Sequence, residues 1–253
     1  MKQWIEKSNL PLHEVTTCAI GAQYIEIIKA LTSLGIQVIP IKPDIRLPEP
    51  LQGHGDMQIC YLGQGKMLLL PGREELREAL TGLGFLTEDS DPPGKYYPQD
   101  VKLNAVFLGK KCICNSKIID KKITNHCREQ GIEIVEVSQG YSKCNLCVVD
   151  ERSGITSDKG IERVLSKLGL DILLISEGHI QLPGYPWGFI GGCSGLLGKN
   201  TIAFTGSLNS HPDAEKIKSF IHRRRMNIIE LTNGPLLDIG SILPLEEKVE
   251  RTT

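Results

Sequence analysis

Apolar positions along this chain repeat one arrangement five times: a helical stretch, a short stop and then an apolar strand. Within each helical stretch the apolar residues recur every three to four positions or so, as on one face of an amphipathic helix. The five junctions fall at residues 32–41, 81–88, 128–137, 166–175 and 223–231. Four of them stop the helix at a glycine, namely Gly35, Gly84, Gly131 and Gly169. Glycine suits this place because it takes the left-handed conformation without a Cβ penalty.

Between these junctions lie short apolar runs joined by turn residues, which predict β-hairpins. They occupy residues 57–70, 105–115, 145–157, 194–206 and 235–245. The glycine stops are 49, 47 and 38 residues apart. A period of this size indicates a repeat architecture, in which no single unit can bury its own apolar face. The fold class that we expect is therefore α/β, built from five ββαβ units.

The two ends of the chain carry partial units. The chain opens with a helix and a strand at residues 21–41 and closes with the hairpin at 235–245. We expect this C-terminal hairpin to complete the first unit, because a closed ring leaves no sheet edge at a seam. The prediction is a five-fold pseudosymmetric α/β propeller, with helices outside and hairpins facing a central channel. Residues 1–253 form one domain in this interpretation, and the stretches 43–50 and 89–98 are loops between units.

Composition narrows the classes of partner. The formal net charge of −1 gives no reason to expect nucleic acid, and the basic run at 223–225 ends a helix, where cations are favoured. The polar stretch 1–14 lacks the apolar core of a signal peptide, and no run reaches the ~18 apolar residues that span a bilayer. We therefore expect a cytoplasmic protein with no membrane contact, whose eight cysteines are reduced thiols.

Three segments resemble an uncharacterised bacterial family that is assigned to the pentein fold. They are HGDM at 54–57, NLCVVDERSG at 145–154 and PWGFIGGCSGLLG at 186–198. A ring of five ββαβ units is also similar to the pentein fold of guanidino-group-modifying enzymes. These include arginine deiminases, dimethylarginine hydrolases and amidinotransferases, along with non-catalytic members that bind ribosomal subunits. The resemblance runs from Cys18 to Glu247; it implies the fold and leaves the function open.

The catalytic penteins attack a guanidinium carbon with a cysteine thiolate, shuttle protons on a histidine and hold the planar cation with carboxylates. By this resemblance His54 is the candidate general acid/base. Asp56, on the same strand face, is a candidate substrate-binding carboxylate. Cys193 follows two glycines and is the candidate nucleophile. The structural alternatives are a loop histidine beside flexible glycines and a small buried thiol.

Further acids and thiols extend the candidate set. Asp150 ends an apolar run and Asp238 lies within one, so both are candidates for binding the substrate cation. Cys147 and Cys144 are alternative nucleophiles in a Cys-x-x-Cys motif.

The order of the hairpins bears on the choice of nucleophile. In the hydrolases that the chain resembles, the histidine comes two hairpins before the cysteine. His54 in the first hairpin and Cys193 in the fourth cannot be brought to this order by rotating the ring. His54 with Cys144 or Cys147 in the third hairpin can.

These patterns predict a small-molecule ligand in the central channel. The resemblance implies a guanidine- or amidine-like compound, hydrolysed or transferred through a covalent thiouronium on cysteine. The alternative is a non-catalytic binding scaffold on the same ring. Cys112 with Cys114, and Cys144 with Cys147, have spacings that a zinc or iron–sulfur site would use. We favour strand-packed cysteines and expect neither a metal nor a cofactor.

Overall fold

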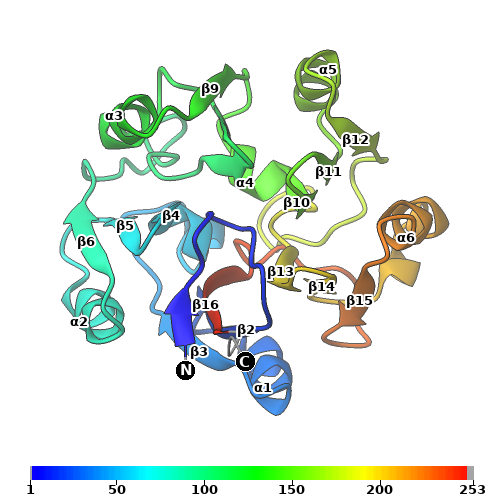
Figure 1. The fold of residues 1–253 in the computed structure, drawn as a ribbon, viewed down its shortest axis with the longest axis horizontal. Helices are drawn as coiled ribbons and strands as arrows, with labels where there is room; N and C mark the ends of the chain where they lie inside the picture. The colour runs from blue at the N-terminus through cyan, green and yellow to red at the C-terminus, as the bar shows by residue number, and fades with distance from the viewer. Residues whose placement is uncertain (1, 250–253) are drawn as a thin grey trace.

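The computed structural model describes residues 2–249, and they form a ring of five small sheets around a central axis (Figure 1). In four units an antiparallel pair of strands is followed by a helix and a third strand parallel to the second. The second unit has β4 (Ile59–Gly63), β5 (Lys66–Leu69), α2 (Glu74–Gly82) and β6 (Leu86–Asp89). The third has β7 (Val106–Leu108), β8 (Lys111–Cys114), α3 (Lys121–Glu129) and β9 (Glu133–Glu136). The predicted ββαβ repeat is confirmed.

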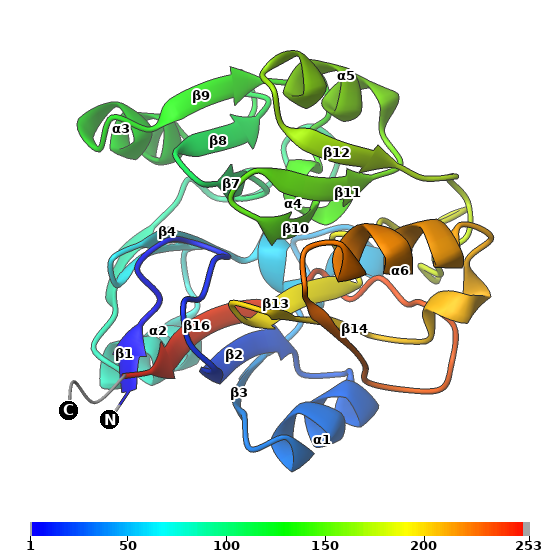
Figure 2. The same ribbon diagram turned by 45° about the vertical axis from the view of Figure 1, so that its right-hand side comes forward.

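The remaining two of these units follow the same order. The fourth has β10 (Cys147–Asp150), β11 (Ser153–Thr156), α5 (Lys159–Lys167) and β12 (Asp171–Leu174). The fifth has β13 (Ser194–Gly198), β14 (Thr201–Phe204), α6 (Ala214–His222) and β15 (Asn227–Glu230). The helix that precedes the last strand of each unit lies on the outside of the ring, as predicted (Figure 1). The turned view separates the strands of the upper units (Figure 2).

The first unit closes the ring by joining the two ends of the chain. Its strands are β16 (Leu243–Lys248), β2 (Val15–Gly21) and β3 (Gln37–Ile41), with α1 (Ile25–Ser33) before β3. β16 pairs antiparallel with β2, and β2 pairs parallel with β3. The short strand β1 (Lys2–Trp4) pairs with the edge of β16 that lies opposite β2.

The expected C-terminal hairpin at 235–245 is wrong. Residues 231–242 contain no strand, and the chain contributes the single strand β16 to the first unit. Its antiparallel partner is the N-terminal strand β2, which the sequence interpretation missed. The seam is therefore closed by one strand from each end of the chain, and the unit is complete without a C-terminal turn.

Positive φ angles mark the predicted helix stops. Gly35, Gly84, Gly131 and Gly169 have φ angles of 80°, 84°, 64° and 73°. The fifth junction places Arg225 in the same conformation, with a φ of 57°. A side chain at this angle is strained, because Cβ approaches the following carbonyl oxygen. The turn geometry is thus shared by all five units, whether or not the residue is glycine.

Each helix buries one apolar stripe against its sheet. In α5 the buried residues are Ile161 and Leu165, and in α1 they are Ile27 and Leu31. Burying one such side chain stabilises the fold by roughly 1.5–3 kcal/mol. The described part of the chain has no helix long and apolar enough to cross a membrane.

Two irregular segments cover the interior of the ring. Residues 5–14, which follow β1, cross the centre of the ring in Figure 1. They are held by the hydrogen bond from the amide of Ile5 to the carbonyl of Leu245 (3.0 Å) and by the buried side chain of Leu10. The segment 177–193 pairs with residues 234–241, for example through Gln181 and Asp238.

Candidate functional site

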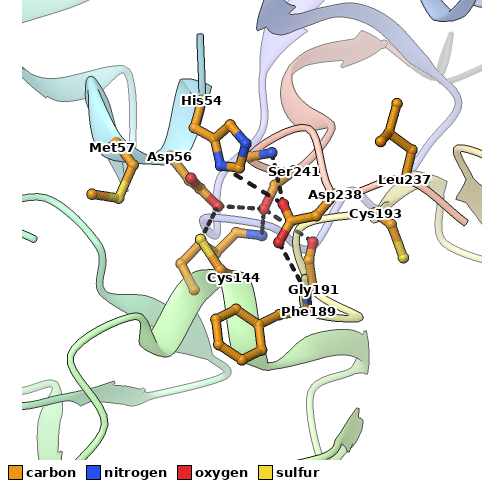
Figure 3. A network of polar contacts seen from close by, with 12 residues as sticks. His54, Asp56, Met57, Cys144, Phe189, Gly191, Cys193, Leu237, Asp238 and Ser241 are labelled. Carbon is orange, nitrogen blue, oxygen red and sulfur yellow. Dashed lines mark hydrogen bonds and ion pairs between the residues drawn. The ribbon is translucent and has the colours of Figure 1, made fainter. Parts of the chain in front are cut away.

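Chain segments that lead into the inner strands of three units bring five polar side chains together. They are His54, Asp56, Cys144, Asp238 and Ser241. The first two precede β4, Cys144 lies in the short helix α4 (Ser142–Asn145) before β10, and the last two precede β16. Figure 3 shows these side chains turned toward one another. All are buried, with at most 2% of their surface exposed. We call these five residues the Cys144 cluster.

The thiol of Cys144 is held between a carboxylate and an amide. Its Sγ donates to Oδ2 of Asp56 at 3.1 Å and accepts from Nδ2 of Asn104 at 3.2 Å. Oδ1 of Asn104 accepts the backbone N–H groups of Lys143 and Cys144, at 2.8 and 3.3 Å. Asn104 therefore fixes both the sulfur and the turn of α4 that carries it.

Ser241 connects the carboxylate of Asp56 to a buried amine. Its Oγ lies 2.8 Å from Oδ2 of Asp56 and accepts from Nζ of Lys143 at 3.0 Å. The φ of Ser241 is 70°, which a residue with a side chain rarely adopts. Strain of this kind persists where the surrounding structure fixes it, and it gathers at functional sites. Ser241 thus holds Asp56 and Lys143 at the cost of a strained backbone.

His54 has no hydrogen bond on either ring nitrogen. Its Nδ1 lies 3.7 Å from Oδ1 of Asp238, which is beyond hydrogen-bond distance. Burial lowers the pKa of His54 to about 4, although the neighbouring Asp56 acts in the opposite direction. The imidazole is therefore neutral at neutral pH.

Burial shifts the acids of the cluster toward their neutral forms. Burial raises the pKa of Asp238 to about 6. The N–H groups of Phe189 and Gly240, which donate to this carboxylate at 2.9 and 3.1 Å, act in the opposite direction. Burial likewise raises the pKa of Asp56. Burial, reinforced by these two carboxylates, raises the pKa of the Cys144 thiol well above its usual range. Without a ligand the sulfur is therefore a thiol, and a nearby positive charge would favour the thiolate.

Space at the cluster is small. A cavity of about 20 Å³ is lined by Asp56 and Lys143 together with Ser8 and Asn9 of the N-terminal segment. A cavity needs about 10–15 Å³ of this kind of volume to hold one water molecule. The structure therefore has room for one water-sized molecule beside Asp56.

The structure brings together some of the predicted site residues and not others. His54, Asp56, Asp238 and the alternative nucleophile Cys144 meet in the cluster. Cys193, the first-named nucleophile, is buried in an apolar region, where its Sγ donates to the carbonyl of Ile190 at 3.3 Å. In Figure 3 its sulfur is directed away from the cluster.

Cys147 and Asp150 also lie outside the Cys144 cluster. The thiol of Cys147 is buried among apolar side chains, and burial raises its pKa to about 11. The side chain of Asp150 is 42% exposed and pairs with Nε of Arg224 at 3.3 Å. Arg224 comes from a neighbouring helix end, so Asp150 stabilises the contact between two units at the rim of the ring.

Sequence reasoning missed three members of the site: Asn104, Lys143 and Ser241. Each lies in a segment that enters the first strand of a unit, as His54 and Cys144 do. That position is the shared signal, because the first strands are the innermost ones and their leading segments reach the axis. β13, for example, contacts both β10 and β16 near the centre.

Thiol pairs proposed from spacing do not meet. The sulfur atoms of Cys112 and Cys114 lie 4.0 Å apart. Both residues belong to one apolar cluster that does not include Cys144 or Cys147. Within residues 2–249, the one group of three or more metal-ligand types with mutually close atoms is His54, Asp56 and Cys144. All eight cysteines are free and buried.

A family model described as a family of unknown function (DUF6873) matches residues 20–243. The chain belongs to this family. The match spans all of the site residues named above. No curated protein sequence matches the chain significantly.

Solved structures with this architecture include several guanidino-group-modifying enzymes. DDAH from Pseudomonas aeruginosa, complexed with citrulline, is similar at a TM-score of 0.58 and 10% identity, over 93% of this chain and 100% of that one. An amidinotransferase from Microseira wollei in the saxitoxin biosynthetic pathway is similar at a TM-score of 0.59 and 10% identity, over 98% of this chain and 97% of that one. Agmatine deiminase from C. jejuni is similar at a TM-score of 0.55 and 11% identity, over 90% of this chain and 93% of that one. The fold of this family member is therefore the pentein fold, as the repeat pattern indicated.

Proposed function

We propose that this protein binds a guanidine- or amidine-like cation at the Cys144 cluster and that Cys144 attacks its central carbon. The observation that carries the proposal is the contact of the Cys144 sulfur with Asp56 at 3.1 Å, beside a neutral His54 and a second carboxylate, Asp238. The similar structures of guanidino-modifying enzymes support it at the level of the fold.

Recognition would use the two buried carboxylates. A guanidinium or amidinium is planar and presents N–H donors that carboxylates match. Asp56 Oδ1 has no hydrogen-bond partner in the closed cluster, and Asp238 receives only backbone donors. A bound cation would therefore find free acceptors, and it would relieve the crowding of acidic groups around one amine, that of Lys143.

Activation of the sulfur would follow from the same cation. Its positive charge, placed against Cys144, lowers the pKa of the thiol, and the neutral ring of His54 accepts the proton. The thiolate then forms a C–S bond with the central carbon. The C–N bond to the leaving amine breaks, and that amine takes the proton from His54. A water molecule completes hydrolysis of the covalent thiouronium, and an amine completes amidino transfer.

Ligand entry requires a cover to move, because the cavity beside Asp56 is water-sized. The N-terminal residues Ser8 and Asn9 line that cavity and form its nearest cover. A substrate would displace this segment or the loop 177–193 on its way to the cluster.

Turnover of a panel of guanidino and amidino compounds tests the proposal. Wild type should release ammonia or a free amine from at least one of them, whereas Cys144→Ser should release none. Cys147→Ser is the matched control, because Cys147 belongs to the same Cys-x-x-Cys motif but lies outside the cluster; it should retain turnover. Equal turnover by wild type and Cys144→Ser would contradict the proposal.

A non-catalytic binding role is the second candidate, and the closed cluster favours it. The interior is filled by side chains, and the sulfur is a thiol in the absence of a ligand. In that case a guanidino compound would raise the melting temperature of wild type and of Cys144→Ser alike, and neither protein would turn it over.

A further inference from the structure

The Cys144 cluster also has the composition of a metal site. The sulfur of Cys144, a carboxylate oxygen of Asp56 and a ring nitrogen of His54 all lie within 4.8 Å of one another. Thiolate sulfur, imidazole nitrogen and carboxylate oxygen are the three ligand types that zinc takes in proteins. Each comes from a buried part of the fold, because α4, the turn at residues 55–57 and the adjoining His54 are all buried.

Three buried polar atoms at this place have no hydrogen-bond partner among the described residues. Both ring nitrogens of His54 and Oδ1 of Asp56 are buried and make no hydrogen bond. Such groups are rare in native proteins, because desolvation of an unpaired polar atom is costly. The ring and the carboxylate belong to the same close group as the sulfur, so one ion between them would satisfy atoms from each.

Size and charge both favour a small cation over an organic molecule in the closed state. The adjoining cavity of about 20 Å³ admits a single water-sized guest. Two carboxylates and one ionisable thiol face a single buried amine, that of Lys143. A divalent ion would balance this excess of acidic groups without displacing either cover.

We infer that the cluster binds one Zn²⁺ through Cys144, His54 and Asp56, with a fourth position left to Asp238 or water. Binding replaces the proton of the Cys144 thiol, which passes to solvent, by a bond from sulfur to zinc. The inference does not depend on the proposed catalytic function. A protein that never reacts with a guanidine would still bind the ion through these atoms.

Titration of the metal-free, full-length protein with Zn²⁺ and Co²⁺ tests the inference. Wild type should bind one equivalent. The Co²⁺ form should show a sulfur-to-cobalt charge-transfer band, together with the intense visible bands of a low-symmetry, four-coordinate site. Cys144→Ser should lose the charge-transfer band, and its affinity for Zn²⁺ should fall by at least about 100-fold, since even outer-shell changes cost 10–100-fold.

Matched variants keep the result interpretable. Cys147→Ser should bind like wild type, because its sulfur is packed in the apolar core. His54→Gln should keep the charge-transfer band but weaken binding, and unfolding midpoints in urea should show that each variant is folded. Absence of binding by wild type, or a charge-transfer band that persists in Cys144→Ser, would overturn the inference. Persistence of the band would show that other thiols, such as those of Cys112 and Cys114, bind the metal.

Discussion

The sulfur of Cys144 lies 3.1 Å from Oδ2 of Asp56, although 88 residues separate them along the chain. The ring makes this contact possible, because each residue leads into the first strand of its own unit and those strands are innermost. The turn at residues 55–57 and the helix α4 therefore converge from two different sheets. The site belongs to the fold as a whole and to no single unit.

Replacement of Asn104 should weaken both the fold and the site. Asn104→Ala removes the donor to the Cys144 sulfur and the acceptor for two backbone N–H groups of α4. Leaving such groups unpaired in the interior costs about 1–3 kcal/mol. We expect the free energy of unfolding in urea to fall by about 2 kcal/mol or more. Asn115→Ala removes an asparagine with two backbone contacts nearer the surface and should cost well under half of that; equal losses would contradict the assignment.

Arg225→Gly should stabilise the protein. Arg225 is exposed and holds a φ of 57° at the stop that four other units build with glycine. Relief of that strain, less the entropy that glycine adds to the unfolded chain, should raise the free energy of unfolding by about 0.5–1 kcal/mol. Gly169→Ala makes the reverse change where nothing lies within 4 Å of the added Cβ. It should destabilise by a similar amount. A destabilised Arg225→Gly would show that the arginine side chain matters more than its backbone.

These positions also show what the sequence could predict and what it could not. The helix stops and four of the hairpins are local features, so the residues of each segment were enough to predict it. Closure of the ring by the C-terminal end was predicted, but the strand pair at the seam was not. The partner of β2 lies more than 200 residues away, and the sequence contains no turn between the two strands. Cys193 and Cys144 both precede an inner strand; only packing decides that one thiol faces Ile190 and the other faces Asp56.

Gly240→Ala should disable the site through His54. Gly240 has a φ of 74°, and an added Cβ would lie 2.4 Å from the Cβ of His54. The imidazole must move, so ligand binding at the cluster should be lost together with about 2–4 kcal/mol of stability, from strain plus overpacking. Gly35 has a φ of 80° and nothing within 4 Å of an added Cβ, so Gly35→Ala measures the cost of the backbone strain alone. Its cost should be about 1 kcal/mol with ligand binding intact. Retained ligand binding in Gly240→Ala would contradict the role given to His54.

Acid should destabilise the fold in part through His211. Its Nδ1 accepts the amide N–H of Asp213 at 3.0 Å, and its Nε2 donates to the carbonyl of Ser176 at 3.1 Å, so the folded state holds the ring neutral. Burial lowers the pKa of His211. The neighbouring His179 lowers it further, whereas Asp213 raises it.

The sign of the effect follows from the direction of that shift. The unfolded chain takes up the proton first, so the stabilisation is complete above about pH 6.5 and is lost as the pH falls toward the folded pKa. The slope is at most about 1.4 kcal/mol per pH unit for one group. Urea unfolding at pH 7.5 and 5.5 should show a smaller loss for His211→Gln than for wild type. An identical loss would rule out His211 as a contributor.

The most direct test of the proposed site is labelling with a haloacetamidine, a cationic alkylating reagent, followed by peptide mass spectrometry. Attack by Cys144 forms a C–S bond and expels the halide, while His54 accepts the thiol proton. The matched reagent is the haloacetamide, which is neutral and of the same size. If carboxylates recognise the cation, the amidine should modify Cys144 at least about tenfold faster than the amide, and Cys147 and Cys193 should stay unmodified. Modification of Cys193 in place of Cys144, or equal rates with the two reagents, would contradict the account.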